Sequence, residues 1–195
     1  IACTSLSRKL RTGAGQLMAR PMRATDLRIA LFSGNYNYVR DGANQALNRL
    51  VGYLLRQGAA VRVYAPVTDT PAFPPTGDLV GVPSFAVPRR PEYRVPLRLG
   101  RAVRRDIGGF APNLVHVSSP DFAGHAAVRY ARRHGLPAVA SVHTRFETYP
   151  RYYGLAFMEP VVEAVLRRFY RRCDAIMAPS DSMAQLLRQQ RMSYD

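Results

Sequence analysis

This sequence contains little cysteine and no long apolar run. Its 195 residues include only Cys3 and Cys173, which lie far apart along the chain. This argues against a disulfide-stabilised scaffold and favours a reducing compartment. No apolar run approaches the roughly 18–20 residues that span a bilayer. Residues 1–25 also lack the apolar segment and cleavage site of a secretory signal. We therefore expect a cytoplasmic protein.

Several nucleotide-binding and catalytic motifs are also missing. The first expected strand is not followed by G-x-G-x-x-G, and no G-x-x-x-x-G-K-[ST] or G-x-S-x-G occurs, which excludes the usual dinucleotide, P-loop and nucleophile-elbow signatures. No Cys/His spacing suits zinc, and no D-x-D pair could hold a metal against a diphosphate. An anionic ligand would have to be bound by backbone amides and arginines. We expect no metal and no cofactor.

Acidic residues are few, so the chain is strongly basic. It has 13 Asp and Glu against 28 Lys and Arg, a formal net charge of +15, and Lys9 is its only lysine. Such an excess favours anionic partners: nucleic acid, phosphate-bearing substrates or an acidic membrane surface. Aromatic residues are not interleaved with the basic stretches and no known RNA- or DNA-binding signature appears, so we expect no nucleic-acid partner.

One dense arginine stretch has two interpretations. It includes Arg98, Arg101, Arg104 and Arg105, and a second stretch covers residues 167–172. A charge run is usually a solvated helix face. The alternative is a patch that docks the protein peripherally on anionic lipid, at the inner face of the cell membrane, with apolar neighbours such as Leu97 inserting.

Short apolar segments alternate with amphipathic ones from residue 27 onward. This alternation predicts an α/β fold, a Rossmann-like doubly wound parallel sheet with helices on both faces. The expected strands are Leu27–Phe32, Ala60–Ala65, Gly81–Val87, Leu114–Val117, Ala138–Val142 and Ala175–Ala178. The expected helices cover about 42–57, 96–108, 122–134, 155–172 and 181–187. Residues 1–25 show no periodicity, so we expect a disordered extension followed by one domain over residues 26–195.

Polar residues gather where three of the expected strands end. The first cluster contains Asn35, Tyr36, Tyr38, Gly42 and Ala43. The second contains Ser118 and Ser119, and the third contains His143, Thr144 and Glu147. In a doubly wound sheet the carboxyl ends of the strands lie along one edge, so all three clusters should face one crevice. Loops on such a scaffold commonly carry recognition residues.

Four segments in this order resemble the N-terminal domain of family 4 retaining glycosyltransferases, which have the GT-B fold. The segments are GNYNYVRDGANQALNRLVGYLLRQG, NLVHVSSPDFAGHAAVRYARRHGLP, VASVHTRFETYPRYYG and CDAIMAPSDSM. The resemblance covers about residues 27–195 and is nearest to the branch with GDP-mannose-dependent α-mannosyltransferases and glycosyl- or sulfoquinovosyl-diacylglycerol synthases. It implies transfer of a hexose from a nucleotide diphosphate sugar to a lipid or glycan hydroxyl.

The resemblance also implies roles for particular residues. Gly42 and Ala43 would offer backbone N–H groups to the donor diphosphate at a helix N-terminus. His143 would lie beside the donor sugar as the candidate catalytic residue, followed by Thr144. Glu147 would orient the site through Arg145, Arg151 or an acceptor hydroxyl. The acceptor would be contacted by Asn35, Tyr36, Tyr38, Ser118 and Ser119.

One family feature is absent from this sequence. Members of the family hold the nucleotide diphosphate mainly with a C-terminal domain that carries Glu-x7-Glu, but here Leu155 follows Glu147 and Arg167 follows Glu159 at that spacing. We therefore expect this chain to be the acceptor-side half of a longer protein and to be inactive alone. The alternative is a non-catalytic Rossmann-like domain that binds an anionic lipid or nucleic acid. Neither interpretation identifies the sugar, the base or the acceptor.

Overall fold

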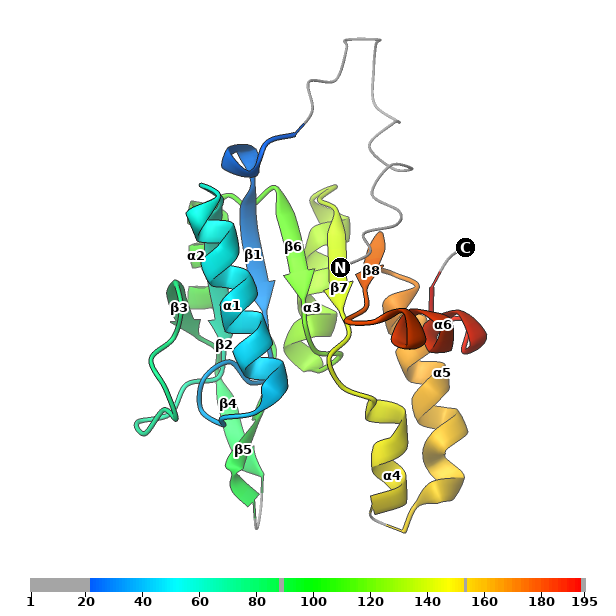
Figure 1. Cartoon of the computed structure of the whole chain (residues 1–195). Coiled ribbons are helices and arrows are strands. Elements are labelled where there is room, and N and C mark those ends of the chain that lie inside the picture. The colour runs from blue at the N-terminus through cyan, green and yellow to red at the C-terminus, as the bar shows by residue number, and fades with distance from the viewer. Residues whose placement is uncertain (1–21, 88–89, 153, 194–195) are drawn as a thin grey trace, which may run out of the picture.

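The sheet at the centre of the protein is parallel throughout. The computed structural model describes residues 22–87, 90–152 and 154–193 (Figure 1). Six strands lie in the order β3-β2-β1-β6-β7-β8, and every neighbouring pair is parallel. They are β1 (Arg28–Phe32), β2 (Ala60–Ala65), β3 (Asp78–Gly81), β6 (Leu114–Val117), β7 (Ala138–Ser141) and β8 (Ala175–Met177). The predicted α/β Rossmann-like fold is confirmed.

Helices cover both faces of this sheet. They are α1 (Gly42–Arg56), α2 (Arg101–Phe110), α3 (Phe122–Arg133), α4 (Tyr149–Tyr152), α5 (Glu159–Tyr170) and α6 (Asp181–Gln189). Alternation along β1 divides the core in two: Ile29 and Leu31 pack with α1, whereas Ala30 and Phe32 pack with residues of α2, α3 and α5. Each central strand is therefore buried on both sides, as its nearly continuous apolar sequence requires.

A small antiparallel hairpin departs from the prediction. The expected single strand Gly81–Val87 is the end of β3 followed, after Pro83, by β4 (Ser84–Val87). β4 pairs antiparallel with β5 (Arg90–Pro96), which the sequence did not predict. A proline cannot donate a ladder hydrogen bond, so Pro83 separates the two strands. Figure 1 shows the hairpin and α4 extending past the carboxyl ends of the strands, on opposite sides.

Two helices begin later than predicted. α2 starts at Arg101, after Gly100 as N-cap, because the chain up to Pro96 belongs to β5. α5 starts at Glu159 with Pro160 in its first turn, where proline is favoured; the 3-10 helix η3 (Ala156–Met158) precedes it. Of the extension predicted to be disordered, residues 1–21 lie outside the described residues. Ala24 and Thr25 belong to the 3-10 helix η1 (Ala24–Asp26).

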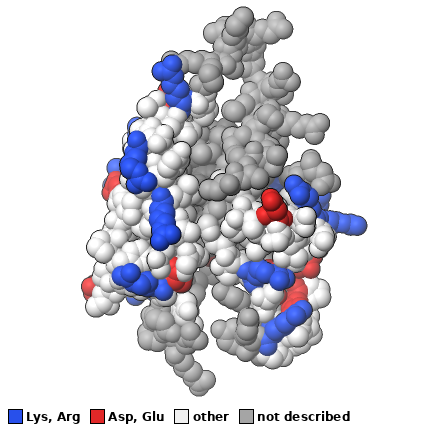
Figure 2. Space-filling view, viewed as in Figure 1, with Lys and Arg blue, Asp and Glu red and all other residues white. Residues whose placement is uncertain are grey.

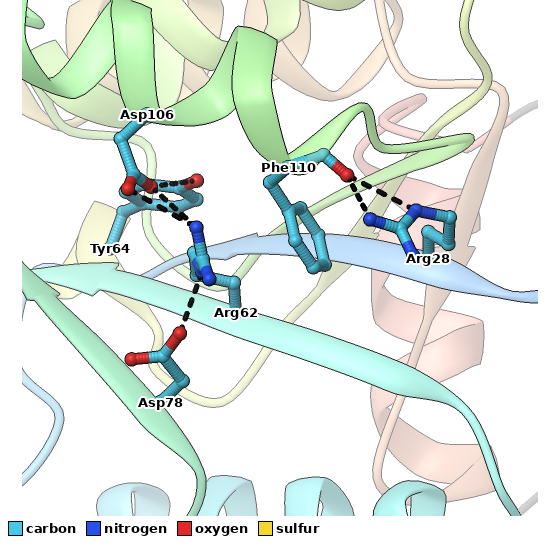
Figure 3. Close-up of polar contacts among 6 residues, drawn as sticks. All are labelled: Arg28, Arg62, Tyr64, Asp78, Asp106 and Phe110. Atoms are coloured by element: carbon cyan, nitrogen blue, oxygen red, sulfur yellow. Dashed lines mark hydrogen bonds and ion pairs between the residues drawn. The ribbon is translucent and has the colours of Figure 1, made fainter.

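A charged cluster joins β2 to α2 and β3 (Figure 3). Arg62 on β2 donates to Asp78 at 2.7 Å and to both carboxylate oxygens of Asp106, on α2, at 3.1 and 3.2 Å. The buried Tyr64 donates its hydroxyl proton to Asp106 at 2.8 Å. Asp106 is therefore the shared acceptor for a guanidinium and a phenol.

Phe110, the last residue of α2, lies between two arginines in the same region (Figure 3). The guanidinium carbons of Arg28 and Arg62 are each 4.9 Å from the centre of its ring. Arg28 also donates from Nε to the Phe110 carbonyl oxygen at 3.1 Å. These contacts fix the end of α2 against β1 and β2.

Candidate active site at the carboxyl edge of the sheet

The first helix begins with free backbone donors. The Asp41 carboxylate caps α1 by accepting from Asn44 N at 2.7 Å, and the Asp41 carbonyl accepts from Gln45 N at 3.1 Å. Among the residues that the structure describes, the N–H groups of Gly42 and Ala43 have no partner. A Cβ at Gly42 would meet no atom within 4 Å, so the space beside these donors is open. An anion can approach the positive end of α1 here.

The two tyrosines of the β1–α1 loop are structural supports. Tyr36 is fully buried, and its hydroxyl donates to the Thr76 carbonyl oxygen at 2.6 Å. Its ring packs in the core, so the prediction that Tyr36 contacts the acceptor is wrong. Tyr38 is 8 % exposed and donates to the Gly34 carbonyl oxygen at 2.6 Å. Burial raises the pKa of Tyr38 to about 12, so this phenol stays protonated.

Asn35 differs from these tyrosines because its side chain is incompletely satisfied. Its Oδ1 is buried, and no described residue donates a hydrogen bond to it. Buried polar atoms without partners are rare in proteins and costly. Asn35 therefore remains a candidate contact to a ligand that carries donor groups.

The second cluster lies directly against the first loop. A Cβ at Gly34 would be 2.6 Å from Asp121 Oδ2 and 3.0 Å from Ser119 Oγ, so only a glycine permits this approach without displacement. Asp121 caps α3 by accepting from Gly124 N at 2.8 Å, and the Ser119 hydroxyl donates to its other oxygen. Ser118 N donates to the Phe32 carbonyl oxygen at 2.9 Å. Both serines thus hold the edge together, in addition to any ligand contact.

His143 follows β7 and is partly buried at the same edge. Its Nε2 is 3.0 Å from the hydroxyl oxygen of Ser141, the last residue of the strand. Burial lowers the pKa of His143 below its usual value, and the negative charge of Asp41 opposes this change. His143 follows β7 and Asp41 precedes α1, so both lie at the carboxyl edge of the parallel sheet. His143 is a neutral imidazole near pH 7.

His116 completes a buried chain of polar groups. Its Nε2 is 2.8 Å from the same Ser141 hydroxyl oxygen, and its side chain is 3 % exposed. Burial, with a smaller contribution from His143, lowers the pKa of His116 to about 4. Sequence reasoning gave Ser141 no role, although it lies in the segment VASVHTRFETYPRYYG. Strand alternation is the signal, because positions 139, 141 and 143 share one face and Val139 is the register partner of His116.

Thr144 and Glu147 continue the third cluster. Thr144 is partly buried beside His143. Glu147 lies in the 3-10 helix η2 (Phe146–Thr148) and accepts from Arg145 Nε at 2.8 Å. Arg151, the other expected partner, instead donates from Nη2 to Glu159 at 2.8 Å. The Glu147–Arg145 pair is therefore the arrangement that the structure supports.

The predicted arginine patch lies on an exposed side of α2. Arg101, Arg104 and Arg105 are exposed, opposite a buried side formed by Val103, Ile107 and Phe110. Arg98, in the segment before the helix, is exposed as well. Positive charge is not confined to α2: on the face drawn in Figure 2, basic side chains also line α1 and the α4–α6 region, where acidic side chains accompany them.

A separate depression of about 680 Å³ lies on α5. Its walls combine apolar side chains with the second arginine stretch: Val161, Ala164, Val165, Arg167, Arg168, Arg171 and Arg172. It shares no residue with the crevice. None of the helices in the described parts of the chain is long and apolar enough to cross a bilayer. Within those same parts, no three His, Cys, Asp or Glu side chains are grouped to hold a metal ion.

Comparisons with known proteins agree with this geometry. A GDP-mannose-dependent alpha-mannosyltransferase of Mycolicibacterium smegmatis is 32% identical over 162 residues, which is 80% of this chain and 43% of that protein. Sulfoquinovosyl transferase SQD2 of Arabidopsis thaliana is 27% identical over 155 residues, 78% of this chain and 30% of that protein. Alpha-monoglucosyldiacylglycerol synthase of Acholeplasma laidlawii is 24% identical over 128 residues, 65% of this chain and 32% of that protein. The chain spans less than half the length of these relatives.

The profile that describes Glycosyltransferase Family 4 matches residues 40–194. This match begins just before α1 and includes all three polar clusters except the first residues of the β1–α1 loop. The parallel Rossmann-like sheet, with His143 and the start of α1 at its carboxyl edge, is consistent with one half of a GT-B enzyme. The chain therefore belongs to glycosyltransferase family 4.

Proposed function

We propose that the full-length protein is a retaining hexosyltransferase. It moves a sugar from a nucleotide diphosphate sugar to a hydroxyl group of a lipid or glycan, and this chain forms the acceptor-side half of its active site. The relatives support this proposal, since their names specify mannosyl, sulfoquinovosyl and glucosyl transfer. The observation that carries it is that His143, which follows β7, lies at the same carboxyl edge of the parallel sheet as the open start of α1, which follows β1.

The start of α1 is suited to the leaving group. In the proposed reaction, the bond between the anomeric carbon and a diphosphate oxygen breaks, and negative charge grows on that oxygen. The unpartnered N–H groups of Gly42 and Ala43 and the positive end of α1 would stabilise this charge without a metal ion. Such preorganised donors are effective because they need no rearrangement as the charge develops.

His143 is suited to hold the sugar. As a neutral imidazole near pH 7 it has one donor and one acceptor nitrogen, and Nε2 is already engaged by Ser141. The other nitrogen would bond a sugar hydroxyl or the departing oxygen. We propose no covalent protein intermediate: the acceptor oxygen bonds to the anomeric carbon on the face that the diphosphate leaves, and the acceptor proton passes to the diphosphate.

The acceptor would lie along the loops of the same edge. We propose contacts from Asn35, whose Oδ1 no described residue satisfies, and from Ser118, Ser119 and Thr144 at its border. Glu147, held by Arg145, would orient an acceptor hydroxyl. If the acceptor is a lipid, the exposed arginines Arg98, Arg101, Arg104 and Arg105 would hold the enzyme peripherally on an anionic, cytoplasmic membrane face.

The test is turnover by the full-length protein against a panel of nucleotide sugars, with GDP-mannose and UDP-glucose first. Each donor is offered with and without a diacylglycerol or phosphoinositide acceptor. We expect one donor to be consumed, with the product keeping the anomeric configuration of the donor by NMR. We further expect the 195 residues alone to bind donor weakly and to turn nothing over. A folded full-length protein that binds anionic lipid but transfers no sugar from any donor would favour a non-catalytic binding domain instead.

A further inference from the structure

The inner end of the His143 side chain contacts a row of polar groups that continues beneath the crevice. We propose that His116 and Ser141 are positioning residues for His143: they hold its Nε2 and fix the ring as the tautomer that carries its proton on Nδ1, the nitrogen left for the ligand. The inference deepens the proposed function and rests on it for the choice of tautomer, whereas the bridge from His116 through Ser141 to His143 rests on geometry alone.

Strand geometry places the three groups in a line. His116 is on β6 and is paired in register with Val139 of β7. Side chains two residues apart on a strand share a face, so Ser141 and then His143 continue the row that begins opposite His116. The Ser141 hydroxyl oxygen lies 2.8 Å from His116 Nε2 and 3.0 Å from His143 Nε2. One hydroxyl therefore bridges two imidazoles.

The inner two members of this row cannot serve a ligand directly. His116 is 3 % exposed and Ser141 is 4 % exposed. Serine and histidine are more often exposed than buried at this level, and a buried polar pair has a cost unless it is satisfied. A role that acts through His143 explains why both polar groups occur under the crevice.

The number of protons in the row limits its arrangements. Ser141 has one hydroxyl proton, so it can donate to only one of the two ring nitrogens. If His116 donates from Nε2 to Ser141 and Ser141 donates to His143 Nε2, the proton of neutral His143 must be on Nδ1. If instead His143 donates from Nε2 to Ser141 and Ser141 donates to His116 Nε2, His143 Nδ1 would carry a lone pair. If both rings donate to Ser141, His143 Nδ1 would likewise be bare.

The ligand that this site is proposed to bind selects among these arrangements. The oxygens of an ionised diphosphate accept hydrogen bonds and have no proton to donate. The ring nitrogen that faces them is therefore better occupied by N–H than by a lone pair. His116, from β6, is the titratable neighbour on the inner side, and its pKa of about 4 keeps it neutral above pH 5. A donor on Nδ1 matches the phosphate and sugar oxygens of the proposed donor substrate.

The first experiment reads the tautomer itself and needs no turnover. The 195-residue chain is labelled with 15N-histidine, and ring nitrogen shifts and two-bond couplings are measured at pH 7.5. We expect His143 to carry its proton on Nδ1. In Ser141→Ala and in His116→Phe we expect the Nε2–H form to appear and the pKa of His143 to rise, because the hydroxyl that favours a bare Nε2 is lost or reoriented. Ser141→Thr, which keeps the hydroxyl, should restore the original spectrum.

Ser182→Ala is the control, since Ser182 is exposed on α6 and its hydroxyl contacts only Ser180 among the described residues. It should leave the His143 signals unchanged. Melting temperatures identify any variant that fails to fold. If Ser141→Ala or His116→Phe does not fold, the comparison of Ser141→Thr with wild type still tests the inference. A wild-type His143 with its proton on Nε2, or signals that do not respond to any change at Ser141 or His116, would overturn the inference.

The second experiment asks what the arrangement does. In the full-length protein, Ser141→Ala should lower kcat about 10- to 100-fold with little change in KM, the range found when the partner that orients a metal-bound histidine is removed. Ser141→Thr should recover most of this loss. Unchanged kcat and pH profile in Ser141→Ala would contradict a positioning role. If no donor is turned over at all but the tautomer responds as expected, the proposed function fails and the positioning of His143 stands.

Discussion

At the scale of single residues, the effect of His143 on catalysis can be measured separately from its effect on stability. Its ring is partly buried at the crevice, and among the described residues it forms one hydrogen bond, with Ser141. We predict that His143→Ala in the full-length protein lowers kcat by about 10²–10³, the loss typical of one preorganised contact to a transition state, about 3–4 kcal/mol. The melting temperature should change little. Both quantities are measured on the same preparation.

His134→Ala is the matched control for this change. His134 is exposed at the end of α3. Among the described residues its side chain contacts only Tyr130: Nδ1 lies 2.9 Å from the Tyr130 carbonyl oxygen, and the two rings stack. Its loss should affect neither activity nor, beyond a few tenths of a kcal/mol, stability. A His143→Ala protein that melts earlier yet keeps normal activity per folded molecule would show that the histidine is structural.

His116 makes the fold sensitive to acid. Its pKa is about 4 in the folded protein and about 6.5 in the unfolded chain, so only the unfolded state gains the proton as pH falls between these values. The stabilisation that comes from keeping His116 neutral is complete above about pH 6.5. It decreases by about 3 kcal/mol as the pH falls towards 4. His143 and His125, whose pKa values are also lowered, act in the same direction. The raised pKa of Asp121 acts in the opposite direction.

We therefore predict that His116→Gln flattens the pH dependence of stability. Glutamine places a polar atom near the original Nε2 but does not titrate. Urea unfolding between pH 7.5 and 4.5 should show a smaller decline for this variant than for wild type. Parallel declines in the two proteins would mean that His116 is not held neutral by the fold.

The loop tyrosines show the limit of sequence reasoning at this scale. Tyr36 and Tyr38 have similar neighbours in sequence, so nothing in the pattern distinguishes a core side chain from a ligand contact. The distinction comes from distant partners: Thr76 accepts from the Tyr36 hydroxyl, and Asn48 donates to the Tyr36 carbonyl oxygen at 2.8 Å. The position of His143 was predictable because an apolar strand ends directly before it. The Ser141 bridge depends on strand register, which the sequence does not specify.

At the scale of elements, the contact between α2 and β2 depends on Asp106. We predict that Asp106→Ala lowers the free energy of unfolding by about 1–3 kcal/mol, because it leaves the buried Tyr64 hydroxyl without its acceptor and removes one partner of Arg62. Chemical denaturation measures the loss. Glu163→Ala is the comparison, since it removes a half-exposed i,i+4 pair with Arg167 on α5, and such helix pairs contribute about 0.3–0.5 kcal/mol. Equal losses would mean that the shared acceptor adds nothing.

For strands and helices with a clear hydrophobic period, the predicted bounds lie close to the observed ones. β2 and β6 have the predicted bounds, and α1 ends within one residue of its predicted end. A strand was predicted over β4, but β5 and its pairing with β4 were not, because residues 88–96 contain three prolines and show neither a helical nor an alternating pattern. The antiparallel pairing there comes from partners across the turn, such as Phe85 with Val95. Local sequence carries little information about such pairing.

At the scale of the whole molecule, the net charge of +15 predicts salt-dependent association with anionic surfaces. If the α2 patch is the contact, replacing Arg98, Arg101, Arg104 and Arg105 with Gln should weaken binding to phosphatidylglycerol vesicles at least about tenfold, since each arginine near the surface contributes on the order of 1 kcal/mol. Binding of wild type should also fall as salt is raised. Vesicle sedimentation measures both effects.

A second quadruple variant separates position from total charge. Arg49, Arg56, Arg132 and Arg133 are exposed on α1 and α3, and their replacement with Gln removes the same four charges. This variant should bind vesicles nearly as well as wild type. Equal weakening of the two variants would assign the binding to net charge, and no effect of salt or of either variant would leave the α2 arginines as a solvated helix face.

The central position of β1 has a consequence for how the chain acquires its structure during synthesis. β1 pairs with β2 soon after it in sequence, but its other neighbour is β6, whose Leu114 pairs with Ile29 across 85 residues. At about 5–20 residues per second, the ribosome needs roughly 4–17 s to add that length. During this interval β1, whose side chains are mostly apolar, has no strand beside it along one edge. The nascent first half is thus the form most exposed to chaperones and to mispairing, until β6 emerges and closes the sheet.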